Sequence, residues 1–234
     1  GANTYAGTTT VSAGTLQLGA ADRINNSSNM VLSGGTFSTG SGAGFNETIG
    51  TLSVTANSTI ALGTGAHTLT FANSSATTFT SGTLLTITGW TGTNNGNSSG
   101  TAGKIFFGSS AGTLTGLQLS RIRFNISAVN YGAMQLSTGE IVPSGGQVLY
   151  YGGATGTWTG SLWGTVEGGP YTTAWTSGRH AIFNVASANT LTFASTNVAA
   201  ITYNENITYA AGGSLTTGPS GGAVMPIYVE SGKT

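Results

Sequence analysis

The stretch GANTYAGTTTVSAGTLQLG, which runs from Gly1 to Gly19, carries the pattern that decides the fold. A run of threonines leads into Val11, and small residues follow from Ser12 to Gly14. Leu16 and Leu18 then alternate with polar residues. Alternation with a period of two is typical of a β-strand that buries one face, and glycine permits a tight corner between strands. The stretch therefore predicts two short strands joined by a corner of small residues.

The same pattern recurs along the chain in the phrases SGGTF, IGTLSV, SGTLLTI and SAGTLTGLQL. Glycine, asparagine and serine separate short alternating segments, and no window has the apolar spacing of an amphipathic helix. The chain is therefore predicted to be all-β. The predicted strands contain these alternating apolar residues: Leu16 and Leu18; Met30 and Leu32; Leu52 and Val54; Ile60 and Leu62; Leu69 and Phe71; Leu85 and Ile87; Ile105 and Phe107; Leu117 and Leu119; Ile122, Phe124 and Ile126; Val148 and Tyr150; Leu191 and Phe193; Ile201 and Tyr203; Ile207 and Tyr209; Ile227 and Val229.

Such strands could form a sandwich, a barrel or a solenoid. The strands are very short, the corners hold small residues rather than hairpin Asn-Gly pairs, and the phrases repeat. We therefore expect a parallel β-helix, or β-solenoid, of the usual right-handed kind, with Gly, Ser and Asn at its corners. Coils of about 20 residues, stacked about 4.8 Å apart, would give roughly a dozen coils. Outward Asn and Thr of consecutive coils are expected to form hydrogen-bonded ladders.

The strand alternation changes phase between Leu119 and Ile122. A change of phase moves the apolar side chains to the other face of a strand, so the chain must bend there. The sequence predicts a corner or bulge at Ser120 and Arg121, with Arg121 and Arg123 facing outward.

The character of the sequence changes around GEIVPSGG, from Gly139 to Gly146, after which aromatic residues become frequent. We place a module boundary here. Residues 1–145 form the first β-solenoid module. Residues 146–234 form a second β-rich module, which is expected to continue the solenoid.

Only 5% of the 234 residues are charged, and six basic residues balance six acidic ones. A neutral surface of Ser, Thr, Asn and Gly provides little repulsion between molecules, which suits a fibre or a cell coat. Arg121 and Arg123 are the only close basic pair, so nucleic acid is not an expected partner. The chain has no cysteine, so it offers no disulfide and no thiolate metal site.

No apolar run approaches the roughly 18 residues that span a bilayer, and no basic start followed by an apolar stretch marks a signal peptide. We therefore expect no membrane span in this segment, and we interpret it as a mature or excised part of a longer protein.

The opening stretch, ETIGTLSVTANSTIALG from Glu47 to Gly63, the LSRIRF segment and GEIVP together carry a family resemblance. They resemble the autotransporter-associated, or passenger-associated, β-strand repeat of bacterial surface proteins, most strongly over residues 1–145. The resemblance implies a β-solenoid located outside the cell or on the surface of a Gram-negative-type bacterium. The resemblance implies an architecture and an export route rather than an activity. No cofactor is expected.

The order of these segments is reversed relative to that family. The stretch from Trp158 to the end of the chain resembles the coils that precede a repeat beginning with the letters NTY. In this chain the NTY letters stand at residues 3–5, before that stretch. Two explanations remain open. The chain is a piece of a longer array of modules, or it is a subunit whose last coils are completed by the first coils of the next copy. The second explanation predicts a head-to-tail homopolymer.

The pattern G-x-S-x-G, typical of hydrolase nucleophiles, occurs at Gly96–Gly100, Gly108–Gly112 and Gly218–Gly222. The motif needs a strand, a turn and a helix, together with a histidine and an acid. No helix is predicted after any of the three, and Asp22 is the only aspartate. Chance matches in a chain rich in Gly and Ser are therefore the better interpretation.

Carboxylates and histidines are sparse. Polysaccharide-degrading enzymes need paired carboxylates, which the stacking of coils could bring together, but solvated or turn-capping roles are favoured here. His67 and His180 lie in different modules without a second ligand type nearby, so no metal site is expected. Both are expected to be exposed or half-buried at strand edges. The six acids are Asp22, Glu47, Glu140, Glu167, Glu205 and Glu230.

A group of aromatic residues follows the module boundary. Large rigid rings could form a platform that stacks on sugars, or they could cap the solenoid or line a subunit interface. The cap or interface is favoured, because glycine-rich flanks would let the rings fold over a core. The group consists of Tyr150, Tyr151, Trp158, Trp163, Tyr171 and Trp175.

The sequence thus favours a non-catalytic, extracellular structural protein that builds a surface fibre or stalk, with a second copy of itself as partner. An adhesin or carbohydrate-binding passenger module that recognises surface glycans is the alternative. A polysaccharide-degrading enzyme is the third hypothesis.

Overall fold

The computed structural model describes residues 2–185, 187–192, 194–210, 212, 215–217, 227–229 and 232. The predicted strand residue Phe193, the acid Glu230 and the motif at Gly218–Gly222 lie outside the described residues.

The chain divides into two compact units. Unit 1 comprises Gly1–Val129 and Ala133–Pro143, and unit 2 comprises Asn130–Gly132 and Ser144–Thr234. The unit boundary between Pro143 and Ser144 lies two residues before the expected module boundary, and Asn130–Gly132 belong to unit 2, which was not expected.

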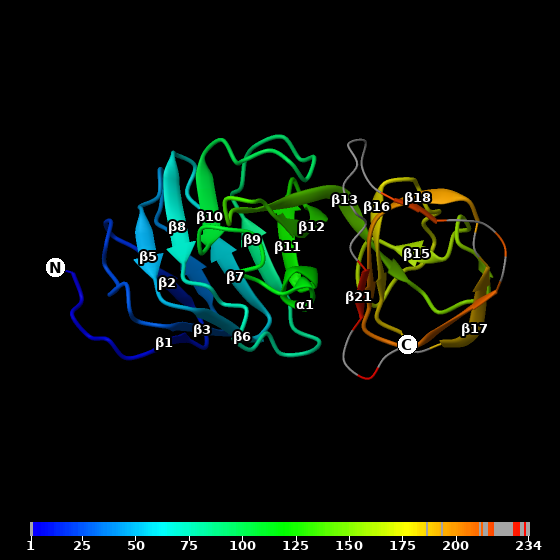
Figure 1. The fold of residues 1–234 in the computed structure, drawn as a ribbon, viewed down its shortest axis with the longest axis horizontal. Helices are drawn as coiled ribbons and strands as arrows, with labels where there is room; N and C mark the ends of the chain where they lie inside the picture. The colour runs from blue at the N-terminus through cyan, green and yellow to red at the C-terminus, as the bar shows by residue number, and fades with distance from the viewer. Residues whose placement is uncertain are drawn as a thin grey trace. The chain divides into compact units, whose positions relative to one another are not determined.

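Unit 1 is built from short parallel strands in three ladders (Figure 1). Their orders are β1–β3–β6, β5–β8–β10 and β2–β4–β7–β9–β11. The strands are β1 (Thr9–Val11), β2 (Thr15–Gln17), β3 (Met30–Ser33), β4 (Thr36–Ser38), β5 (Glu47–Ile49), β6 (Leu52–Ala56), β7 (Ser58–Ala61), β8 (His67–Phe71), β9 (Leu85–Thr88), β10 (Gly103–Phe107) and β11 (Ile122–Ile126). A helix, α1 (Gly116–Ser120), precedes β11, and β12 (Val129–Gln135) contains residues of both units.

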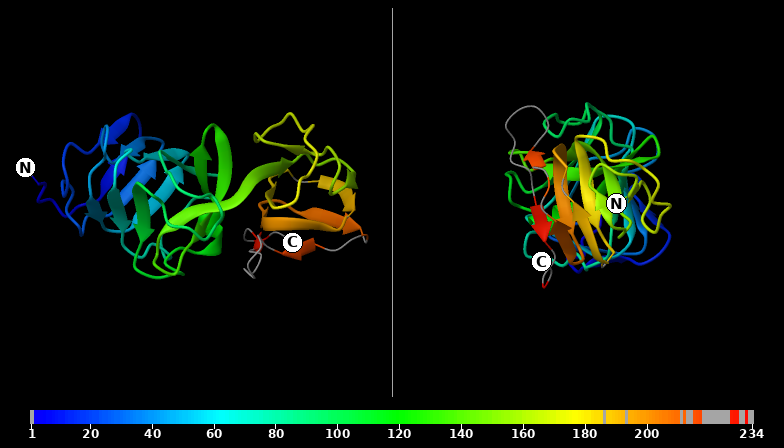
Figure 2. Two further views of the ribbon diagram at one scale, coloured as in Figure 1. Left: turned by 90° about the horizontal axis from the view of Figure 1, so that it is seen from above. Right: turned by 90° about the vertical axis from the view of Figure 1, so that its right-hand side faces the viewer.

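Unit 2 contains two further ladders. In the first, β13 (Ile141–Tyr151) pairs in parallel with β16 (Arg179–Phe183), and β16 pairs with β18 (Thr196–Tyr203). Both β20 (Leu215–Thr217) and β21 (Ile227–Val229) pair in parallel with β18, and β15 (Trp163–Gly164) pairs antiparallel with β13. The second ladder has the order β14 (Gly156–Thr157), β17 (Ser187–Thr192), β19 (Ile207–Ala210). Figure 2 shows the strands of each unit lying side by side. The all-β prediction is confirmed, and the ladders are predominantly parallel.

Adjacent strands of unit 1 are separated by a step of about one repeat. Thr9 pairs with Met30 and Met30 pairs with Leu52, which are steps of 21 and 22 residues. Later steps are longer, because Leu85 pairs with Ile122, a step of 37 residues that includes α1. The described steps of unit 1 therefore depart from the constant step on which the expected dozen coils depended.

Apolar side chains line up in columns because the parallel strands are in register. One column of unit 1 contains Leu16, Phe37, Ile60, Ile87 and Phe124, each paired with the next. The last four are fully buried. Burying one large apolar side chain stabilises the folded state by about 1.5–3 kcal/mol, so such a column contributes strongly to the stability of unit 1.

Asparagine side chains outside the core bind the backbone of a segment about 22 residues further along the chain. The Asn29 Oδ1 accepts the Thr51 N–H at 2.9 Å, and the Asn46 Oδ1 accepts the Thr68 N–H at 2.8 Å. Each bond spans 22 residues, so each asparagine satisfies a backbone donor of the next repeat.

The predicted strand at Leu117 and Leu119 is wrong, because this segment forms α1. Thr115 and Gln118 form a capping box that satisfies two backbone donors at the start of the helix. The Gln118 Nε2 also donates to the Ser74 and Thr77 carbonyls at 2.8 and 2.9 Å, which fixes the helix against unit 1.

Arg121 and Arg123 do not face outward as predicted, but are 9% and 2% exposed. The Arg123 Nη1 donates to the Ser120 and Ile122 carbonyls at 2.6 and 2.8 Å, and the Arg121 Nη1 donates to the Phe79 carbonyl. A guanidinium has five donors, so it can satisfy carbonyls where α1 and the loops leave them without a strand partner.

Candidate functional site

The aromatic group lies mainly inside unit 2. Trp158, Trp163 and Tyr151 are 0% exposed, and Trp175 is 5% exposed. The Trp163 Nε1 donates to the Trp158 carbonyl at 2.8 Å, and its ring centroid lies 5.1 Å from that of Trp158. Stacking on a sugar needs an open ring face, so these four rings serve as core and not as a sugar platform.

The other two aromatic residues belong to a second cluster. Tyr150 packs with Val148 and Ile182, and Tyr171 lies against them half-buried. Tyr150 and Tyr151 are neighbours on β13, and successive side chains of a strand point to opposite faces. The structure therefore divides the predicted group of six rings into four and two.

The column of unit 1 begins with Leu16, which is the most exposed of its five side chains. Leu16 is 36% exposed, whereas its column neighbours Phe37 and Ile60 are 0% exposed. Within the described residues, β2 has a strand neighbour on one edge only, and so does β1 in its own ladder. The backbone groups of both free edges, together with Leu16, form the first open end.

Unit 2 has a matching feature at the far end of its first ladder. Leu149 pairs with Ala181, and Ala181 pairs with Ile201 on the next strand. These side chains are 1%, 0% and 1% exposed, in that order. Ile201 pairs with Ile227, which is 54% exposed, and Val229 on the same strand is 43% exposed. Among the described strands β21 pairs with β18 alone, and we call β21 with these two side chains the second open end.

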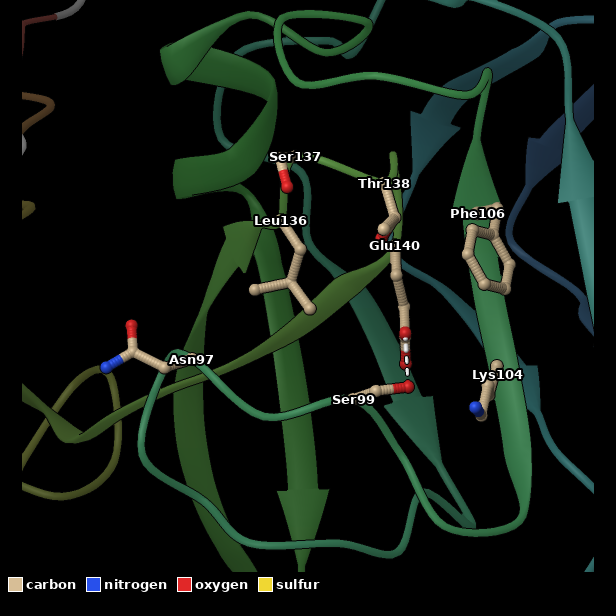
Figure 3. A pocket seen from close by; sticks show the side chains of 8 residues that line it. All are labelled: Asn97, Ser99, Lys104, Phe106, Leu136, Ser137, Thr138 and Glu140. Carbon is tan, nitrogen blue, oxygen red and sulfur yellow. Dashed lines mark hydrogen bonds between the residues drawn. The ribbon is translucent and has the colours of Figure 1, made fainter.

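A groove of about 460 Å³ lies in unit 1 beside β10 (Figure 3). It is lined by Asn97, Ser99, Lys104, Phe106, Leu136, Ser137, Thr138 and Glu140. A second groove of about 360 Å³ also includes Lys104, and its other lining residues include Asn46, His67 and Thr68. Lys104 therefore borders both grooves.

Glu140 also lines the first groove and is 2% exposed. One carboxylate oxygen accepts the Ser99 Oγ–H at 2.6 Å, and the other accepts the Gly100 N–H at 2.8 Å. These bonds reach across 41 and 40 residues, so the carboxylate holds the loop containing Ser99 in place.

Gly139 brings the turn that carries Glu140 close to β10. The Phe107 N–H donates to the Gly139 carbonyl at 3.0 Å. Gly139 has φ of +86°, and a Cβ there would lie 2.7 Å from the Gly108 carbonyl oxygen. Only glycine accepts this conformation and this contact without strain.

Glu47 is a second buried acid, 1% exposed. Its carboxylate accepts the Arg23 N–H at 2.7 Å and the Ile24 N–H at 3.3 Å. Burial raises the pKa of Glu47, and the two backbone hydrogen bonds oppose that rise. Glu47 and Glu140 each bind backbone donors, which agrees with the predicted turn-capping role, although neither is solvated.

Both histidines are buried, which corrects the expectation of exposed or half-buried rings. His67 is 5% exposed, with Nε2 2.8 Å from the Thr39 Oγ1 and Nδ1 2.9 Å from the Gly65 carbonyl. His180 is 1% exposed, with Nε2 2.8 Å from the Thr202 Oγ1. The part of the chain that the structure describes contains no group of three or more His, Cys, Asp or Glu suited to a metal ion.

Of the hydrolase-like motifs, Gly108–Gly112 is followed by a helix after all, since α1 begins at Gly116. Ser110, its central residue, is exposed, and the histidine rings are hydrogen-bonded to threonines elsewhere. The motif therefore lacks the histidine partner of a catalytic serine.

None of the described helices is long and apolar enough to cross a membrane. Comparison of the chain with protein-family models, with curated proteins and with solved structures gives no match.

Proposed function

We propose that the chain is a non-catalytic structural protein, a parallel β-helix that assembles head to tail into a fibre or stalk outside the cell. The parallel ladders of unit 1, with steps of 21 and 22 residues, support the β-helix. The resemblance to the autotransporter-associated repeat supports the extracellular or cell-surface location. One observation carries the assembly, namely that Leu16 and Ile227 leave an in-register apolar column exposed at each open end.

The two open ends offer what a parallel strand needs as a neighbour. An unpaired strand edge presents a row of N–H and C=O groups that can pair with another chain. Stacking the second open end of one copy on the first open end of the next would pair these groups. It would also bury Leu16 and Ile227, each contributing about 1–2 kcal/mol. The near absence of charge removes the repulsion that keeps such edges apart in other proteins.

The buried acids support a structural role over polysaccharide degradation. A glycosidase needs one carboxyl group that donates a proton to the leaving group and a second, nearby carboxylate that acts as base or nucleophile. Glu47 and Glu140 instead accept hydrogen bonds from the backbone of distant segments.

The test is assembly at several concentrations, followed by sedimentation velocity and electron microscopy. The native chain is expected to form longer species as its concentration rises from micromolar to millimolar. Leu16→Asp and Ile227→Asp should each abolish this growth, because each variant buries a charge at one end of every contact. Val166→Asp is the matched control, since Val166 is 60% exposed and lies at neither open end.

Mixing the two variants distinguishes head-to-tail from end-to-same-end contacts. Leu16→Asp retains the second open end and Ile227→Asp retains the first, so the mixture should form a one-to-one dimer and nothing longer. Dimers of either variant alone would indicate contact between like ends. A native chain that stays monomeric at millimolar concentration would contradict the proposal.

A further inference from the structure

The outer face of β10 differs in chemistry from its neighbours. Ile105 and Phe107 are 0% exposed, so Lys104 and Phe106 occupy the opposite face of the strand, half-buried. Lys104 pairs in register with Thr68 and Phe106 with Thr70 on β8. A cation and an aromatic ring thus stand beside a row of threonines on a face that is otherwise neutral.

Lys104 and Phe106 of β10 both line the first groove (Figure 3). Lys104 forms no hydrogen bond or ion pair with the residues that the structure describes, so its three donors remain available. Ser99, Ser137 and Thr138 add hydroxyl groups to the lining. Phe106 adds an apolar ring within the same groove.

Glu140 makes this groove a preformed one. Its carboxylate is nearly inaccessible and ties down Ser99 and Gly100 before any ligand arrives. A binding site whose walls are already ordered spends less free energy on ordering when it binds. The glycine-rich loop is thereby held as one wall of the groove.

The charges of the groove select the ligand class. One ammonium and one carboxylate line it, so its formal charge is zero. The charge of the buried Glu140 carboxylate repels an anionic ligand, and the Lys104 ammonium repels a cationic one. A neutral ligand rich in hydroxyl groups can use the ammonium and the serine and threonine hydroxyls of the lining.

We infer that this groove binds an uncharged oligosaccharide. Phe106 packs against the apolar face of one sugar ring, and Lys104, Ser99 and Thr138 bind its hydroxyl groups. The second groove shares Lys104 with the first, and Asn46 and Thr68 in its lining offer further polar groups, so the ligand is a chain rather than a single sugar. This site is separate from the open ends and does not depend on assembly.

The test uses the full chain and four defined probes: cellohexaose, mannohexaose and hexa-N-acetylchitohexaose, which are neutral, and hexagalacturonic acid, which is anionic. Saturation-transfer NMR and titration calorimetry report binding. At least one neutral probe should bind at millimolar concentration, and Phe106→Ala should weaken it about five-fold or more. Lys104→Gln should weaken it as well, and Lys104→Arg should restore part of the loss.

Tyr5→Ala is the matched control, because Tyr5 is 44% exposed and lines neither groove. It should bind like the native chain, and Phe106→Ala should still assemble like the native chain. Three outcomes would overturn the inference: no neutral probe binds, only hexagalacturonic acid binds, or Phe106→Ala binds as tightly as the native chain.

Discussion

Replacing Trp163 by alanine is expected to lower the free energy of unfolding by about 3–5 kcal/mol. The side chain is fully buried and its centroid lies 4.8 Å from that of Trp175. The variant loses these ring contacts and the hydrogen bond to the Trp158 carbonyl, and it leaves a cavity among rigid rings that cannot collapse into it. Urea unfolding followed by circular dichroism measures the loss.

Trp163→Phe separates the loss of ring packing from the loss of the hydrogen bond, and Val166→Ala serves as the surface control. Trp163→Phe keeps a ring and loses the indole N–H, so about 1–3 kcal/mol should be lost. Val166→Ala changes an exposed side chain and should cost less than about 0.5 kcal/mol. If Trp163→Ala cost as little as Val166→Ala, the ring would be at the surface, and a sugar platform in unit 2 would again be tenable.

Replacing Glu47 by alanine is expected to destabilise the protein by about 1–3 kcal/mol at neutral pH. The Arg23 and Ile24 N–H groups would both lose their acceptor in a buried place. Glu47→Gln keeps one good acceptor oxygen, so it should lose less. Unfolding in urea at neutral pH compares the two variants with the native chain.

The pH dependence of stability gives Glu47 a second signature. Burial raises its pKa above the ordinary 4.5, so the folded chain holds this proton more tightly than the unfolded chain does. Protonation therefore favours the folded state, and the contribution of Glu47 to the free energy of unfolding should rise as the pH falls from the folded pKa toward 4.5.

Glu47→Gln has no proton to gain, so subtracting its stability curve from the native one isolates this contribution. As the pH falls from the folded pKa of Glu47 toward 4.5, the free energy of unfolding of the native chain should rise relative to that of the variant. A difference that is flat with pH, or that moves the other way, would contradict a raised pKa. Glu167→Gln is the matched control, because Glu167 is exposed.

Period-two alternation correctly predicted the central strands. These strands have a neighbour on both edges, so their alternating apolar side chains are buried as expected. Met30, Leu32, Leu69 and Phe71 are all 0% exposed in the strands expected for them. Leu117 and Leu119 show the same alternation but form a helix. The Thr115 and Gln118 spacing was a visible signal of a capping box, and it decides this segment over the alternation.

The open ends and the groove could not be predicted in the same way. Leu16 and Phe37 belong to the same sequence pattern, and only the presence of a strand on both sides buries Phe37. Glu140 and Ser99 meet across 41 residues, and no local signal connects them. By contrast, the separation of Tyr150 from Tyr151 follows from strand geometry and could have been predicted.

The long step between β9 and β11 shows where this architecture tolerates change. The chain leaves the ladder after Thr88, passes through the loop containing Ser99, β10 and α1, and returns with Ile122 opposite Leu85 and Phe124 opposite Ile87. An insertion at such an excursion lengthens the path between strands without altering which side chains meet. Surface loops on unit 1 can therefore be lengthened while the register of the strands is kept. A peptide inserted after Thr93 would exploit this property, because Thr93 is exposed and Ser99 and Gly100 would keep their hydrogen bonds to Glu140.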